Sequence, residues 1–257
     1  MKTLDVITIG RSSVDLYGDQ VGGRLEDMGS FSKYIGGSPT NIACGAARLG
    51  LRTAVITAVG DEHMGRFIVE QLAREGVDTR GVKVDPERLT ALVLLGIRDD
   101  SQFPLIFYRE NCADMGLTED DIDEGFIAEA RAVLATGTHL SHPRTAAAVL
   151  KALTLARKHG ARTALDIDYR PNLWGVAGHG EGESRFVESE AVTKKSAGDA
   201  APLRPHRRHR GGVPHRRRLD RHHRGAPCRA RRLRCDPGVQ AGGEGRRRLR
   251  RPDPGEP

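Results

Sequence analysis

Long hydrophobic runs are absent from this chain of 257 residues, and aromatic residues make up only 4% of it. No stretch approaches the roughly 18 consecutive apolar residues of a transmembrane helix, and the first residues show no basic region followed by an apolar run. We therefore expect a cytoplasmic protein without a membrane partner. The four cysteines form no Cys-x-x-Cys pair and are too few for a disulfide framework. Cys228 and Cys235 lie near His222 and His223, but their spacing matches no common zinc finger.

The last 62 residues lack whole classes of side chain. From Ser196 to Pro257 there is no Lys, Ile, Phe, Tyr, Trp, Met, Asn or Thr, and 18 Arg stand against 6 acidic residues, a net charge of +12. Because the whole chain carries +7, the residues before this segment carry −5. A segment so poor in aromatic and β-branched side chains cannot bury enough apolar surface to offset its ordering entropy. We therefore divide the chain into a globular part, 1–195, and a disordered Arg-, Gly- and Pro-rich tail, 196–257.

This tail has three interpretations. Runs such as Arg216–Arg218 and Arg246–Arg248 would neutralise phosphates, which is typical of a nucleic-acid-binding arm, and a plain solvated tail is a second interpretation. An evolved arm has no physical reason to exclude Lys, however, and the missing residue types share codons that begin with A or T or are rich in them. That pattern indicates GC-rich DNA read out of frame. Translation shifted by one nucleotide from the Ser196 codon is compatible with the sequence RQAMLPLCDLIVGTEEEFHIAGG, which has the composition of a folded protein. We therefore favour a frameshift and do not expect nucleic acid as a partner.

The first 195 residues alternate short β-branched runs with amphipathic stretches, which is typical of an α/β fold with a largely parallel sheet. Predicted strands are 6–9, 53–59, 132–136 and 163–167, and predicted helices are 41–49, 64–74 and 144–159. The apolar runs 92–97 and 103–108 are joined by a short polar segment, which predicts a hairpin that can lie outside the main sheet.

Gly36 and Gly37 lead into the helix predicted from Asn41 onward. Paired glycines let a backbone approach a ligand closely, and a helix N-terminus offers free N–H groups to oxygen atoms. Taken alone, the pair is more typical of a tight turn followed by an Asn cap.

The glycine pair belongs to a longer pattern. Gly36-Gly37-x-x-x-Asn41-x-Ala43-x-x-x-Ala47-Arg48-Leu49-Gly50 resembles the first signature of the ribokinase-like (PfkB) carbohydrate kinases, and Val59-Gly60-Asp61-x-x-x-Gly65 and Ala135–Thr138 also fit that family. The resemblance runs from residue 5 to 195. It implies a three-layer α/β/α fold with a small β lid, truncated after about residue 195, with ATP and Mg²⁺ as cofactors and a homo-oligomer through the lid as one arrangement.

Three segments, 24–31, 108–115 and 166–175, resemble the subgroup that phosphorylates 5-dehydro-2-deoxygluconate in myo-inositol catabolism. This implies a small sugar acid as substrate. A related 2-keto-3-deoxygluconate or fructose kinase is the alternative within the family, and nucleic-acid binding through the tail is the alternative of another class.

The resemblance also assigns roles by position. It implies that the sugar is held by Asp15, Gly36, Gly37 and Asn41, that its carboxylate meets Tyr108 and Arg109, and that the phosphates lie near Asp166, Asp168 and Arg170. The forked guanidinium of Arg suits a carboxylate. The last three residues match a D-x-N-x-R pattern in which Asp168 replaces the usual Asn.

The catalytic base is expected beyond the in-frame region. In this family the base and the anion hole come from a late Gly-Ala-Gly-Asp segment, and that string does not occur in the chain. We therefore assign no catalytic residue and no metal ligand, and we expect the chain as written to be inactive. His63, His139 and His142 show no spacing that indicates catalysis.

Overall fold

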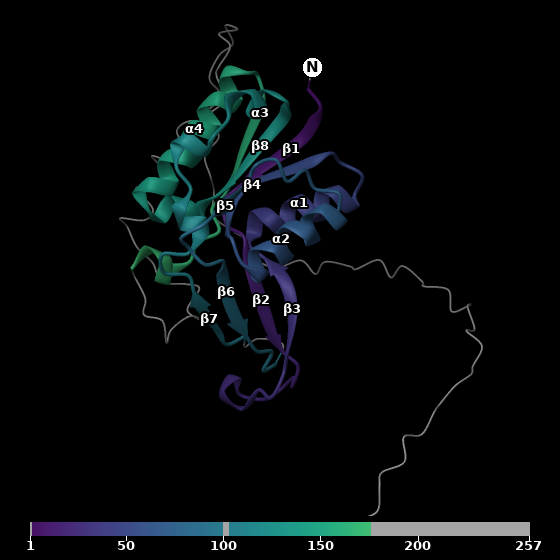
Figure 1. Ribbon diagram of the computed structural model, residues 1–257, viewed down its shortest axis with the longest axis vertical. Helices are drawn as coiled ribbons and strands as arrows, with labels where there is room; N and C mark the ends of the chain where they lie inside the picture. Colours follow the sequence, from purple (N-terminus) through teal and green to yellow (C-terminus); the bar gives the residue numbers. More distant parts are fainter. Residues whose placement is uncertain (1, 100–102, 176–257) are drawn as a thin grey trace, which may run out of the picture. The chain divides into compact units, whose positions relative to one another are not determined.

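A five-stranded parallel sheet forms the centre of the computed structural model, which describes residues 2–99 and 103–175 (Figure 1). Its strand order is β5-β4-β1-β8-β9, and every neighbouring pair is parallel. The strands are β1 (Leu4–Ile9), β4 (Thr53–Gly60), β5 (Val82–Asp85), β8 (Ala130–Thr136) and β9 (Arg162–Asp166). The four strands predicted from sequence all lie in this sheet, and only the short β5 was not predicted.

Helices cover both faces of this sheet. All eight residues of β4 are buried, and alternate side chains enter different cores. Ala54 and Ile56 pack in a cluster with α3 (Glu124–Ala128) and α4 (Pro143–Lys158), whereas Val55 and Val59 pack with α1 (Ser38–Arg48) and α2 (His63–Arg74). Figure 1 shows the two helix pairs on opposite sides of the strands. A strand buried on both faces is typical of a covered parallel sheet, so the predicted α/β/α layering is confirmed.

A second sheet of four strands is the small β layer that the resemblance implied. Its order is β3-β2-β6-β7, where β2 is Ser13–Gly18, β3 Phe31–Gly36, β6 Ala91–Leu95 and β7 Leu105–Tyr108. β6 and β7 are antiparallel, so the predicted hairpin is confirmed and lies outside the main sheet. We call this sheet the lid. Strands β2 and β3 were not predicted from sequence.

The helix boundaries differ little from the predicted ones. α1 begins at Ser38, three residues earlier than predicted, because Pro39 is tolerated in the first turn of a helix. α4 ends just before Gly160, whose φ of 67° continues the chain in the left-handed conformation. Within the described ranges no helix combines the length and apolar character needed to cross a membrane. The predicted boundary at residue 195 and the tail 196–257 lie outside the described residues.

Candidate functional site

A cavity of about 530 Å³ lies where the lid meets the carboxyl end of the main sheet. This volume falls in the range of small-molecule sites, and ligands of open α/β sheets bind at the carboxyl ends of the strands. The lid contributes residues of β2, β6 and β7, and the main domain contributes the start of α1 and the segment after β9. The polar residues among those that line the cavity are Arg11, Asp15, Tyr17, Ser38, Asn41, Asp166, Asp168 and Arg170.

Asp15 lies on β2 and presents a carboxylate to the cavity. Ser13 Oγ donates a hydrogen bond to Asp15 Oδ1 at 2.9 Å. Burial raises the pKa of Asp15, and the Ser13 hydrogen bond and the charge of Arg11 oppose that rise. Gly36 lies on the neighbouring strand β3, where a Cβ atom would overlap the Asp15 carboxylate. The glycine therefore leaves the space that the carboxylate occupies.

Gly37 joins the lid to α1. Its φ of 99° is one that residues with a side chain rarely adopt, and a Cβ atom there would overlap the carbonyl oxygen of Arg11. Gly37 caps α1 without a side-chain hydrogen bond, and its carbonyl oxygen accepts from the N–H of Asn41 at 2.9 Å. The first turn of α1 thus forms part of the cavity wall and brings N–H groups without helical partners to it.

Alanine substitutions at Gly36 and Gly37 are expected to have different effects: one mainly on ligand binding, the other mainly on the free energy of unfolding. Gly37→Ala meets backbone and adopts a strained φ, so the free energy of unfolding should fall by about 1–3 kcal/mol. At Gly36 the three atoms nearest to an added Cβ all belong to the Asp15 side chain, so Gly36→Ala should displace the carboxylate and weaken binding of the sugar that the resemblance implies, with a smaller loss of stability. Urea unfolding and calorimetric titration of each variant measure the two effects. Equal stability losses in both variants would contradict this account.

The last residue of β9 and the segment after it form the acidic side of the cavity. Ser38 Oγ donates to Asp166 Oδ2 at 3.2 Å, and the backbone N–H of Asp168 donates to Asp166 Oδ1 at 3.2 Å. Asp168 has a φ of 35° and its carboxylate forms an ion pair with Arg170 Nη2 at 2.9 Å. The sequence-predicted residues Asp15, Gly37, Asn41, Asp166, Asp168 and Arg170 therefore line one cavity, and Gly36 stands directly behind Asp15.

Tyr108 and Arg109 do not line this cavity. Both line an adjoining, largely apolar cavity of about 690 Å³ that shares Phe107 with the first one, and Arg109 also lines a third cavity of about 500 Å³. Tyr108 is 54% exposed, whereas Arg109 is only 4% exposed. Their predicted contact with a substrate carboxylate thus stays a prediction.

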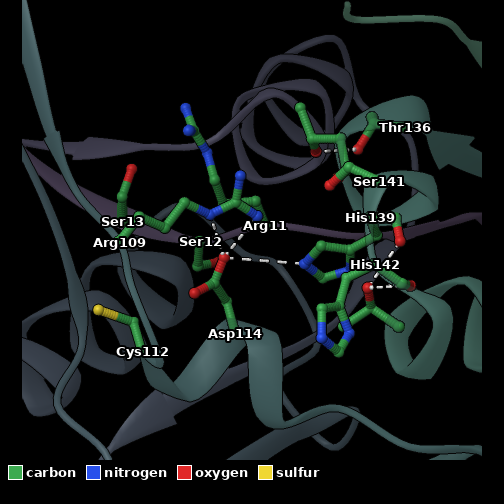
Figure 2. A network of polar contacts seen from close by, with 12 residues as sticks. Arg11, Ser12, Ser13, Arg109, Cys112, Asp114, Thr136, His139, Ser141 and His142 are labelled. Atoms are coloured by element: carbon green, nitrogen blue, oxygen red, sulfur yellow. Dashed lines mark hydrogen bonds and ion pairs between the residues drawn. The ribbon is translucent and has the colours of Figure 1, made fainter. Parts of the chain in front are cut away.

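Arg109 belongs to a buried polar cluster with Asp114 and His139 (Figure 2). Arg109 Nε donates to Asp114 Oδ2 at 2.7 Å, and His139 Nε2 lies 3.7 Å from the same oxygen. Despite its burial Asp114 has a pKa lowered to about 2, chiefly by the positive charge of Arg109. Burial lowers the pKa of His139, which keeps its imidazole neutral at pH 7. His139, which showed no catalytic spacing in the sequence, is therefore fully buried beside an ion pair.

Sequence reasoning missed Arg11, which lines the cavity from the segment between β1 and β2. One signal could have found it. Arg11 follows the first predicted strand by two residues, and the carboxyl end of a parallel strand is where ligand-binding residues collect.

Comparison with known proteins gives one family. The model of the pfkB family carbohydrate kinases matches residues 3–178, which ends short of the predicted limit at 195. The 5-dehydro-2-deoxygluconokinase of Geobacillus kaustophilus is 42% identical over 174 residues, covering 67% of this chain and 52% of that protein. The protein of the same name from Listeria monocytogenes is 40% identical over 174 residues, covering 67% and 54%. The chain therefore spans about half the length of these curated relatives.

Solved structures show the same fold. The PfkB protein of Polaromonas sp. JS666 superposes with a TM-score of 0.68 at 30% identity, covering 77% of this chain and 63% of that one. An uncharacterized sugar kinase of Pyrococcus horikoshii in complex with ATP gives 0.63 at 28% identity, covering 74% and 59%. The fructokinase of Halothermothrix orenii gives 0.62 at 28% identity, covering 78% and 70%.

Proposed function

The chain belongs to the pfkB family of carbohydrate kinases, and on that premise we propose that its cavity holds the sugar for an ATP-dependent phosphorylation of 5-dehydro-2-deoxy-D-gluconate. One observation carries the proposal: Asp15, Gly37 and Asn41, the residues that the family pattern assigns to the sugar, line the same cavity as Asp166, Asp168 and Arg170. The names of the relatives from Geobacillus kaustophilus and Listeria monocytogenes support the substrate.

The residues of this cavity suit a polyhydroxylated ligand. The Asp15 carboxylate accepts hydrogen bonds from sugar hydroxyls, and its Ser13 partner fixes the orientation of one oxygen. The amide of Asn41 can both donate and accept. Apolar side chains of the lid, among them Val93, Leu95 and Phe107, line the cavity and exclude water from its side.

ATP with Mg²⁺ would supply the transferable phosphoryl group. Asp166 and Asp168 offer carboxylate oxygens beside the cavity, and Mg²⁺ carried on a nucleotide commonly takes one or two protein carboxylates and several waters. No cluster of three or more His, Cys, Asp or Glu that could hold a metal by itself occurs in the described parts of the chain. The donors present thus fit a metal that arrives with the nucleotide. Arg170, paired with Asp168, places a cation near the incoming phosphates.

We also propose, below this function, two alternative substrates within the family and one function of another class. The structural similarity to the fructokinase of Halothermothrix orenii favours a neutral sugar within the same family, and a 2-keto-3-deoxygluconate kinase is the acidic counterpart. A nucleic-acid-binding arm would depend on residues 196–257, which lie outside the described residues.

We also propose that the protein forms a homo-oligomer through the lid. The lid ends in β3 on one edge and β7 on the other, and Tyr34 and Tyr108 on these strands are each more than half exposed. Unpaired strand edges with exposed aromatic rings are suited to pairing with a second copy. Sedimentation of the wild type against a Tyr34→Lys variant measures the oligomer, which the charge should weaken.

Replacement of Asp15 is expected to remove sugar binding. Asp15→Ala deletes the carboxylate that accepts hydrogen bonds from sugar hydroxyls, so the Kd for 5-dehydro-2-deoxy-D-gluconate should rise about 10- to 100-fold. Calorimetric titration of the 257-residue chain measures the change. Asp27→Ala is the matched control, because Asp27 is an exposed carboxylate paired with Arg24 and lies outside the cavity residues. An unchanged Kd in the Asp15 variant would contradict the proposal.

A further inference from the structure

Arg11 is a buried cation whose role the family pattern leaves open. It is 7% exposed and lies two residues beyond β1, on the wall of the cavity that contains Asp15. Its Nε and Nη1 atoms are buried, and neither has a hydrogen-bond partner among the described residues. Figure 2 shows its side chain extending away from the Arg109–Asp114 pair.

A buried guanidinium without a hydrogen-bond acceptor is suited to binding an anion. Burial lowers the pKa of Arg11 to about 10, which still leaves the guanidinium protonated at neutral pH. A buried charged donor without an acceptor is costly, commonly by more than a neutral group would be. The Phe107 ring, whose centroid lies 5.2 Å from Arg11 Cζ, supports one face of the guanidinium but accepts no in-plane hydrogen bond.

The nearby carboxylates already have donors of their own. Asp168 is paired with Arg170 at 2.9 Å, Asp114 with Arg109 at 2.7 Å, and Asp15 accepts from Ser13. The negative charges of Asp114, Asp15 and Asp168 favour the protonated form of Arg11 without forming a hydrogen bond to it. Within the described residues Arg11 is therefore the cation of this cavity that lacks an ion-pair partner.

We propose that Arg11 binds the carboxylate of the substrate and makes the cavity selective for sugar acids over neutral sugars. The inference rests on the proposed function and deepens it. The planar fork of an arginine matches a carboxylate with two parallel hydrogen bonds. Asp15 and Asn41 in the same cavity would meet hydroxyl groups, so one ligand carries both kinds of group. This assigns to Arg11 the contact that the sequence resemblance assigned to Arg109.

The test compares the affinity for the sugar acid with the affinity for its uncharged amide analogue. Calorimetric titration of the 257-residue chain with 5-dehydro-2-deoxy-D-gluconate and with its primary amide gives two Kd values for each variant. In the wild type the acid should bind more tightly than the amide. Arg11→Gln should raise the Kd of the acid about 10- to 100-fold and that of the amide less than about threefold. Arg11→Lys, which keeps the charge but loses the fork, should fall between them.

A matched variant separates recognition from structure. Arg74→Gln makes the same change at an exposed arginine on α2 that lies outside the cavity residues, and it should leave the ratio of acid to amide affinity at the wild-type value. Thermal unfolding monitors the fold of each variant, and the wild-type ratio tests the inference even where Arg11→Gln fails to fold. Equal affinity of the wild type for acid and amide, or equal losses for both ligands in Arg11→Gln, overturns the inference alone. Failure of both ligands to bind the wild type overturns the proposed function together with it.

A phosphate is the other anion that could meet Arg11. Titration with ATP distinguishes this source, because the inference predicts the same ATP affinity in the wild type and in Arg11→Gln. A loss of ATP affinity with an unchanged ratio of acid to amide would assign the cation to the nucleotide and overturn the inference.

Discussion

Removal of one nucleotide near codon 196 is expected to turn an inactive chain into a kinase. The 257-residue protein should show no turnover with ATP, Mg²⁺ and 5-dehydro-2-deoxy-D-gluconate, whereas the frame-restored protein should reach roughly 1 to 100 turnovers per second. The reason is chemical. The residues proposed to hold the sugar lie before residue 175, but the Gly-Ala-Gly-Asp segment that carries base and anion hole in the family does not occur in the sequence. Loss of a general base costs roughly 10²–10⁴ in rate, and loss of an anion-hole donor roughly 10²–10³ more.

Two controls accompany this comparison. An Asp15→Ala variant of the frame-restored protein should lose activity, which shows that the measured turnover comes from the proposed cavity. Sugar binding by the 257-residue chain should persist without ATP, because the residues that line the cavity are all present in it. Turnover of the 257-residue chain at ordinary kinase rates would contradict the prediction. A DNA read that confirms the present frame, together with Arg-rich tail peptides in a mass spectrum of the natural protein, would contradict the frameshift itself.

The most readily predicted strand of the main sheet is β4, because it is buried on both faces. β4 is a continuous apolar run whose eight residues are all buried, and such a run stands out in a sequence without knowledge of its neighbours. The lid strands β2 and β3 give no such signal. Three of the six positions of β2 are partly exposed, five of the six positions of β3 are partly or fully exposed, and a glycine-containing segment separates the two strands. Their pairing is therefore a tertiary effect that local periodicity does not record.

The resemblance, rather than the topology, assigned Asp166 and Asp168 to the site, and the fold shows why they lie beside the start of α1. The carboxyl ends of parallel strands meet at one edge of the sheet, which brings Asp166 and Asp168 to the same cavity as the start of α1. Tyr108 and Arg109, which the resemblance assigned to the carboxylate, line an adjoining cavity. Side chains alternate along β7: Leu105 lines the cavity of Asp15, Ile106 and Tyr108 line the adjoining one, and Phe107 lines both. Arg109 lies beyond the end of β7 and pairs with Asp114, and a sequence motif does not record such a tertiary contact.

Replacement of Asp114 is expected to cause a large loss of stability. Asp114 is fully buried, and Asp114→Asn removes the charge that balances Arg109, whose Nη2 lies 2.7 Å from the carboxylate. A buried charge left without its partner typically destabilises a protein by about 3–5 kcal/mol. Urea unfolding at pH 7 measures the difference. Asp27→Asn is the matched control, because Asp27 and Arg24 form an exposed pair at 2.7 Å that should contribute less than about 1 kcal/mol.

Acidification should reduce the difference in unfolding free energy between the wild type and Asp114→Asn. The pKa of Asp114 is about 2 in the folded protein against an ordinary value of 3.8, so the folded state favours the charged carboxylate. The stability that this charge contributes is therefore fully present above about pH 4 and is lost as the pH falls from 3.8 toward 2. Asn carries no titratable proton, so the variant lacks this loss, and the two unfolding free energies should approach each other across that window. A difference that stays constant from pH 7 to pH 2 would show that packing of the side chain, rather than its charge opposite Arg109, holds this part of the core together.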